Sequence, residues 1–252
     1  MGQGSIKPRR IEILGVPVDC VSMTSALDYA DELIAGDKPS VVIAVNPEKV
    51  MKAREDLWLL DQLKSAALLL PDGIGVVWAA RILQLAQLER VAGADLMLAL
   101  CGRAVEKDYR VFLFGASPDT NAIARVAVEK LFPGIRVVGN RHGYVQPNDM
   151  AALIEEINAS GTDILFVGLG SPRQEFWMAT HLPALKVKIC QGVGGTFDVV
   201  AGRVRRAPLR WRDLQLEWAY RLLTEPHRLP RQTALPKFVW QVLTTRLFAR
   251  RG

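Results

Sequence analysis

The sequence predicts an α/β fold in which a mostly parallel sheet carries helices on both faces. Short apolar runs alternate with longer stretches of helical spacing from about residue 40 to residue 195, and such alternation produces βαβ units. Half of the 252 residues are hydrophobic, so a core on both faces of a sheet can be filled. Together these observations predict a Rossmann-like arrangement.

Each expected strand is a short apolar run bounded by charged or turn-forming residues. These runs occupy 40–45, 67–70, 109–115, 135–139, 163–170 and 187–195. The stretches between them that have helical spacing or length are 47–64, 74–84, 95–107, 118–131, 148–159 and 173–182. Ahead of them, residues 11–21 contain a Gly-Val-Pro break and predict a small hairpin.

The charge balance changes after about residue 200. Residues 201–252 contain 12 Lys and Arg against 3 Asp and Glu, whereas residues 1–200 contain 20 against 23. The tail has no strand-like run, and its prolines separate a predicted helix at 210–224 from another that reaches about residue 249. We therefore predict an α/β core over 1–200 and a basic helical appendage over 201–252.

The positive surplus of the tail predicts an anionic partner. Trp211 and Trp218 are seven residues apart and share one helix face. An arginine-rich helix with tryptophans fits an anionic membrane surface or a substrate phosphate, and it also fits a helix that packs tryptophan into the core.

Several classes of protein are disfavoured by composition. Cys20, Cys101 and Cys190 are far apart and form no CxxC pair, so neither a disulfide framework nor a zinc site is expected. No apolar run reaches the length of a spanning helix, and the basic N-terminus is not followed by the apolar stretch of a signal peptide. We expect a cytoplasmic chain with at most peripheral membrane contact.

Polar side chains and glycines follow four of the expected strands, at the edge where an open parallel sheet binds ligands. They are Asn46, Asp72, the stretch GLGSPRQE (168–175) and the stretch GVGGTFD (192–198). Asp72 is the candidate general base, because burial beside an apolar strand raises the proton affinity of a carboxylate. Pro-Asp-Gly is also an ordinary turn and Asp an ordinary helix cap, so the spacing alone leaves both interpretations open.

The two glycine-rich loops do not complete a nucleotide fingerprint. The stretch at 168–175 lacks the third glycine of GxGxxG, and no P-loop motif occurs. Both loops can still offer backbone N–H groups to a diphosphate at a helix N-terminus. The histidines are scattered and no Asp-x-Asp pair exists, so we expect no metal and no cofactor, with Arg90, Arg173 and the tail arginines meeting the diphosphate charge.

Joined in order, these segments resemble the WecG/TagA/CpsF family, glycosyltransferase family twenty-six. The matching stretches are VNPEKV (45–50), LPDGIGVVWAARI (70–82), ERVAGADLM (89–97), VFLFGASP (111–118), VGLGSPRQEFW (167–177), GVGGTFDVVAG (192–202), RRAP (205–208) and LEWAYRLLTEPHRLPR (216–231). They span almost the whole chain in the order of the family.

The resemblance implies a role for each matching residue. Asp72 stands at the proposed base that deprotonates the acceptor hydroxyl, and Asn46 lies in the proposed substrate pocket. Arg90 and Gln174 are expected near the donor, and Gly194 is assigned to substrate binding with them. In the appendage, the arginines expected to meet the diphosphate groups are Arg221, Arg228 and Arg231.

The resemblance also implies an inverting enzyme without an essential metal. It would move a sugar from a UDP-sugar to an undecaprenyl-diphosphate-linked saccharide, peripherally at the cytoplasmic face of the inner membrane. Ala44 stands where the family often has Thr, so the donor stays open among UDP-N-acetylmannosamine, its uronic acid, UDP-glucose and UDP-glucuronate. Arg173 replaces a usual Lys and keeps the charge. Whether the chain forms homo-oligomers is left open.

Two other classes of function compete with this one. A nucleic-acid-binding module would use the basic tail to neutralise phosphates, but it explains neither the acidic balance of residues 1–200 nor the ordered strand-end motifs. We therefore expect no nucleic-acid partner. A Rossmann-type oxidoreductase is weakened by the incomplete fingerprint.

Overall fold

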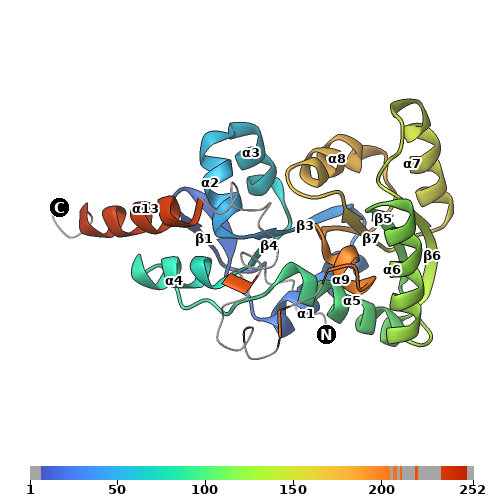
Figure 1. Cartoon of the computed structure of the whole chain (residues 1–252), viewed down its shortest axis with the longest axis horizontal. Coiled ribbons are helices and arrows are strands. Elements are labelled where there is room, and N and C mark those ends of the chain that lie inside the picture. Colours follow the sequence, from blue (N-terminus) through green and yellow to red (C-terminus); the bar gives the residue numbers. More distant parts are fainter. Residues whose placement is uncertain (1–6, 205–206, 209–210, 212–218, 221–233, 249–252) are drawn as a thin grey trace.

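The computed structural model describes residues 7–204, 207–208, 211, 219–220 and 234–248, and it confirms the predicted α/β fold (Figure 1). The strands are β1 (Arg10–Ile13), β2 (Val16–Asp19), β3 (Ser40–Val45), β4 (Leu68–Pro71), β5 (Arg110–Gly115), β6 (Arg136–Arg141), β7 (Ile164–Gly168) and β8 (Ile189–Gly192). The α-helices are α1 (Met23–Ala35), α2 (Pro47–Glu55), α3 (Leu57–Ser65), α4 (Ile74–Ile82), α5 (Gly93–Lys107), α6 (Pro118–Leu131), α7 (Met150–Ala159), α8 (Arg173–His181), α9 (Thr196–Val200) and α13 (Ala234–Phe248).

Six strands form one parallel sheet in the order β4-β3-β8-β7-β5-β6, and β1 and β2 pair as a separate antiparallel hairpin. Strands β3 and β8 are neighbours in the sheet, but the chain leaves them in different directions. The chain returns from β3 through α2 and α3 to β4, whereas β8 leads to α9, which packs against α6. Ligands of open α/β sheets bind at such a switch point, beyond the carboxyl ends of the strands.

Side chains of the sheet alternate between two buried layers. Ile43 and Val45 face the layer that includes α2, α3, α7 and α8, whereas Val42 faces the layer that includes α1 and α5. Figure 1 shows α2, α3 and α8 on one side of the sheet and α1 and α5 on the other. Because both faces are covered, the strands are apolar throughout, which is the pattern that the sequence shows.

Two predicted elements differ in detail. The stretch 47–64 is two helices, because Asp56 ends α2 and caps α3, accepting the N–H of Leu59 at 3.1 Å. The hairpin at 11–21 turns at Leu14 and Gly15, both with positive φ, so the turn contains the glycine of the Gly-Val-Pro break while Val16 and Pro17 already belong to β2.

Helix α1 falls in a segment for which no element is predicted. The signals for it are local. Ser22 and Ser25 form a capping box, and Ala26, Ala30 and Ile34 repeat at helical spacing on the buried face.

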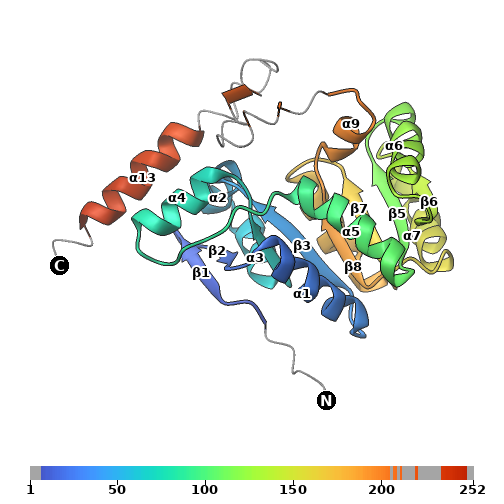
Figure 2. The ribbon, with the colours of Figure 1, turned by 90° about the horizontal axis from the view of Figure 1, so that it is seen from below.

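Helix α13 lies against α2 and α4 (Figure 2). Phe238 and Val242 are each 2% exposed and belong to the core layer that contains α2 and α4. This helix confirms the second helix predicted for the tail, while most of the helix predicted at 210–224 lies outside the described residues. None of the helices described has the length and apolar character needed to cross a membrane.

Candidate active site

The main chain places Asn46, Asp72 and Arg90 at the carboxyl ends of β3 and β4. Val45 pairs with Pro71 in the strand register, so a candidate residue follows each strand at the same level. The N–H of Asp72 donates to the carbonyl of Val45 at 2.9 Å, and the residue after Arg90 donates its N–H to the carbonyl of Pro71 at 3.0 Å. These main-chain bonds hold three half-buried polar residues at one corner of the sheet.

Asp72 stands one residue before the N-cap of the helix that follows it. Gly73 is the N-cap of α4, with φ of 88°. The positive φ explains the glycine, since other residues adopt this conformation only with strain. The turn interpretation of Pro-Asp-Gly therefore holds for Gly73, which occupies the N-cap position itself.

Asn46 has a structural task in addition to any ligand contact. Its Oδ1 accepts the N–H of Lys49 at 2.8 Å, so Asn46 is the N-cap of α2. The proline that follows, Pro47, occupies the first helical position, where its missing N–H does no harm. The start of α2 thereby fixes the orientation of the Asn46 amide beside Asp72.

Gln174 and Gly194 are joined directly. The N–H of Gly194 donates to Oε1 of Gln174 at 2.9 Å, which ties the loop after β8 to the first turn of α8. Gln174 is 4% exposed, and a Cβ at Gly192 would lie 2.6 Å from its Nε2. The glycine at 192 is thus required for the close approach of this amide.

A buried ion pair that was not predicted links the two groups of residues. Lys49 Nζ lies 2.5 Å from Oε1 of Glu175, and both side chains are almost fully buried. Burial acts to raise the pKa of Glu175, but the charge and hydrogen bond of Lys49 and the hydrogen bond of Gln174 outweigh it, so the pKa lies below its ordinary value. Both residues lie in motifs quoted above, yet nothing local in the sequence marks them as partners.

A cleft of about 440 Å³ opens beside this pair, between α2, the loop before α8 and α13. Its lining contains Asn46 together with lysines and glutamates of α2 and one lysine of α13, so a candidate residue faces a cavity. The lining residues are Asn46, Glu48, Lys49, Met51, Lys52, Glu55, Ser171, Pro172, Ala234 and Lys237.

The remaining candidates are placed as follows. Arg221, Arg228 and Arg231 lie outside the described residues. Among the residues that are described, no three His, Cys, Asp or Glu gather as a metal site. Burial raises the pKa of Cys101 and of Cys190 to about 12, so both are protonated thiols of the core.

A comparison with protein families defines the class of this chain. The model of the glycosyl transferase WecG/TagA/CpsF family matches residues 11–252, nearly the whole length. The chain belongs to this family. It is therefore a glycosyltransferase of cell-envelope polymer biosynthesis that uses a sugar donor and a saccharide acceptor.

Proposed function

We propose that this chain is an inverting glycosyltransferase that moves a sugar from a UDP-sugar to an undecaprenyl-diphosphate-linked saccharide without a metal. The observation behind this proposal is the corner where main-chain bonds hold Asn46, Asp72 and Arg90 together. Asp72 is the only carboxylate among these three, which suits it to accept a proton there. Arg90 supplies positive charge for a diphosphate.

The proposed reaction is a single displacement. Asp72 takes the proton of the acceptor hydroxyl while its oxygen attacks the anomeric carbon of the donor. The bond from that carbon to the diphosphate breaks, UDP leaves with the electron pair, and the configuration at the carbon inverts. Holding the two substrates in line supplies much of the acceleration, and arginine side chains stabilise the charge on the leaving group.

Two glycines favour a diphosphate at this edge. Gly170 precedes α8 and Gly194 precedes α9, with φ of 76° and 56°. A Cβ at either position would meet nothing within 4 Å, so the main chain faces open space there. Backbone that is bare in this way can approach a phosphate closely and offer N–H groups to it.

The test is a screen of UDP-sugars against lipid-linked saccharide acceptors, followed by mass spectrometry. We expect one donor to yield a product lengthened by a single sugar, with inverted configuration by NMR and unchanged yield in EDTA. A thermal shift with UDP, NAD and DNA accompanies the screen. Stabilisation by NAD or DNA and not by UDP would contradict the proposal in favour of the competing classes.

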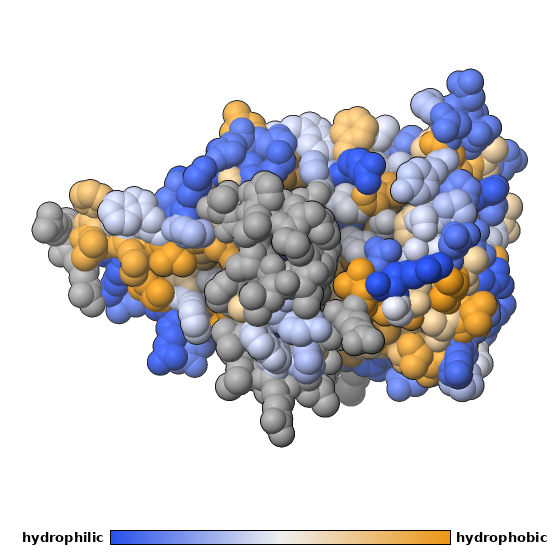
Figure 3. All heavy atoms as spheres, in the orientation of Figure 1, coloured by the Kyte–Doolittle hydropathy of each residue, from blue (hydrophilic) through white to orange (hydrophobic). Residues whose placement is uncertain are grey.

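We further propose that α4 and α13 hold the enzyme on an anionic membrane surface at the cytoplasmic face of the inner membrane. On α13, Trp240 is 70% and Phe248 72% exposed, and on α4 Trp78 is 60% exposed. Figure 3 shows hydrophobic residues gathered over the end of the molecule that α13 forms. Lys237 and Arg246 lie on the same helix, and basic residues beside exposed tryptophan suit anionic headgroups.

Charge introduced on this surface should release the chain from vesicles. Leu247 is 61% exposed on α13, like Trp240. We expect W240E/L247E to reduce co-sedimentation with phosphatidylglycerol vesicles by about tenfold or more, since both exposed apolar contacts are replaced by charges that the headgroups repel. V126E/L131E is the matched control, because Val126 and Leu131 are 62% and 60% exposed on α6, away from this surface, and the variant adds the same two charges. Equal loss in both variants would contradict the proposal. The surface would instead be assigned to contact with a second copy of the chain under one combined result. In that result, wild type forms a dimer that does not bind vesicles, and W240E/L247E dissociates the dimer.

A further inference from the structure

A buried chain of polar groups joins three strand ends of the candidate active site. Lys49 Nζ donates to Oε1 of Glu175 at 2.5 Å, and Nε2 of Gln174 donates to the same oxygen at 3.1 Å. At its other end the Gln174 amide accepts the N–H of Gly194 at 2.9 Å. The chain thus runs from α2, through the first turn of α8, to the loop after β8.

The carboxylate of Glu175 determines which way the Gln174 amide faces. A carboxylate can only accept a hydrogen bond and a main-chain N–H can only donate one, so both neighbours of Gln174 require the same orientation. A rotated amide would set two donors against each other at Gly194 and two acceptors against each other at Glu175. In a site where Gln174 is 4% exposed, such mismatches are costly because water does not compensate them.

Lys49 holds this carboxylate in place. Both donors meet the same oxygen of Glu175, and Oε2 has no hydrogen-bond partner among the described residues. Lys49 itself is fixed at the start of α2, because its N–H donates to Asn46. The orientation of the Gln174 amide is therefore set from the helix that carries the candidate substrate residue.

We propose that Glu175 is the positioning residue of this site and acts through Gln174 on the loop after β8. The main chain of the loop is tied to β7 by the N–H of Val193, which donates to the carbonyl of Val167 at 2.9 Å, and the side chain of Gln174 holds it at Gly194. On the other side, a Cβ at Gly194 would meet nothing within 4 Å. Under the proposed function, on which this inference depends, the outer side of the loop meets the diphosphate of the UDP-sugar. Loss of the inner bond then weakens donor binding although no group that touches the donor has changed.

Two double variants that differ only at residue 175 test this role. K49M/E175Q removes both charges but keeps an acceptor oxygen for the Gln174 amide. K49M/E175M removes both charges and the acceptor, with side chains of similar length. Replacing a buried ion pair by apolar residues of similar volume is often neutral for stability, so both doubles are expected to fold with similar Tm.

The expected result is a difference in donor binding at equal stability. UDP should bind K49M/E175Q within about twofold of wild type and K49M/E175M about tenfold more weakly, as expected when a buried hydrogen bond is lost. The KM for the donor should rise in K49M/E175M while the KM for the acceptor stays the same. Hydrogen exchange at Gly194 should be faster in that variant alone. Equal UDP affinity and equal Gly194 exchange in the two doubles would overturn the inference.

This design separates the inference from the proposed function. If wild type binds no UDP, the proposed donor is wrong, and exchange at Gly194 still decides whether Glu175 positions the loop. If wild type binds UDP and the two doubles do not differ, the donor stands and the positioning role fails. A large drop of Tm in K49M/E175M alone would assign Glu175 to folding and overturn its positioning role.

Discussion

Asp163 and Asp72 are aspartates beside buried strands of one sheet. Asp163 lies where the parallel strands begin, called here the amino edge, and Asp72 lies where they end, called the carboxyl edge. At the amino edge, Arg110 donates to Asp163 from its main-chain N–H at 2.8 Å and from its guanidinium at 3.0 and 3.1 Å. At the carboxyl edge, the bond that places Asp72 comes from its own main chain, to the carbonyl of Val45. The carboxylate of Asp163 holds the start of β5 by accepting hydrogen bonds from Arg110. The position of Asp72, by contrast, is set by a main-chain hydrogen bond.

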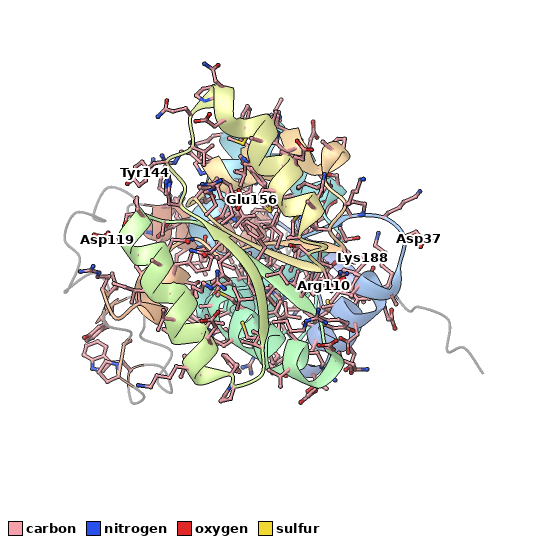
Figure 4. The ribbon with its side chains drawn as sticks, turned by 90° about the vertical axis from the view of Figure 1, so that its right-hand side faces the viewer. Asp37, Arg110, Asp119, Tyr144, Glu156 and Lys188 are labelled. Atoms are coloured by element: carbon pink, nitrogen blue, oxygen red, sulfur yellow. The ribbon has the colours of Figure 1, made fainter. Side chains whose placement is uncertain are left out.

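Other residues at the amino and carboxyl edges differ in the same way. Figure 4 shows Arg110 and Lys188 near one end of the strands and Tyr144 and Asp119 near the other. Lys188 donates to the carbonyl of Gly36 at 2.9 Å, so it too closes the amino edge. The carboxyl edge instead has open glycine loops and a cleft. Charge at the amino edge serves folding, whereas the proposed function assigns Asp72 and Arg90 at the carboxyl edge to chemistry.

The sharpest test of this comparison is a pair of matched Asp→Asn variants. We expect D72N to lower turnover by about a thousandfold, because the acceptor hydroxyl loses its base. Its Tm and its affinity for UDP should stay near the wild-type values. Near-normal turnover of folded D72N would remove Asp72 as the base.

The matched variant D163N should lose stability and keep its turnover, which is the opposite of the result expected for D72N. We expect a loss of about 1–2 kcal/mol in the free energy of unfolding, since an amide accepts the Arg110 hydrogen bonds less well and leaves its charge unpaired. The folded fraction should keep its turnover. Urea unfolding and initial rates on one preparation measure both, and lost turnover at full stability would break the comparison.

The pH dependence of that difference follows from the pKa of Asp163. Burial acts to raise this pKa, but hydrogen bonds from the side chain and main chain of Arg110, with the charges of Arg110 and Lys188, outweigh it, so the pKa lies below its ordinary value. A depressed carboxyl pKa stabilises the fold fully above the unfolded value of about 4 and loses this effect as the pH falls through the folded value. The gap between wild type and D163N should therefore be constant from about pH 5 to 7 and shrink in more acid solution.

The smallest effect is expected at Ala44. A44T restores the hydroxyl that the family often carries two residues before Asn46, and it adds bulk where a Cβ at Gly93 would lie 2.9 Å from that of Ala44. We expect the KM for the donor to change by no more than about fivefold, with an altered ranking of UDP-sugars. A KM changed by orders of magnitude would make residue 44 a main determinant of donor choice.

Much of the site was predictable because its signals are local. Asn46 and Asp72 directly follow apolar runs that can only be buried strands, and the residues after parallel strands share one edge of a sheet. Gln174 and Gly194 lie in stretches that also follow strands, but within those stretches they were singled out by the resemblance to the family. These local signals did not indicate which residue of the folded protein each candidate would contact. Lys49 and Glu175 are 126 positions apart, and a charged residue near the start of a helix has the pattern of an exposed one.

By itself, the sequence determined the fold class, the strands of the parallel sheet and the polar residues that follow four of them. Only the tertiary structure decided that β3 lies beside β8, that Lys49 meets Glu175, and that α13 packs on α2 and α4. The physical reason is the separation along the chain between the residues that determine each feature. Periodicity and turn chemistry are encoded within a few residues, whereas sheet order and buried ion pairs depend on packing between segments that the chain brings together only when it folds.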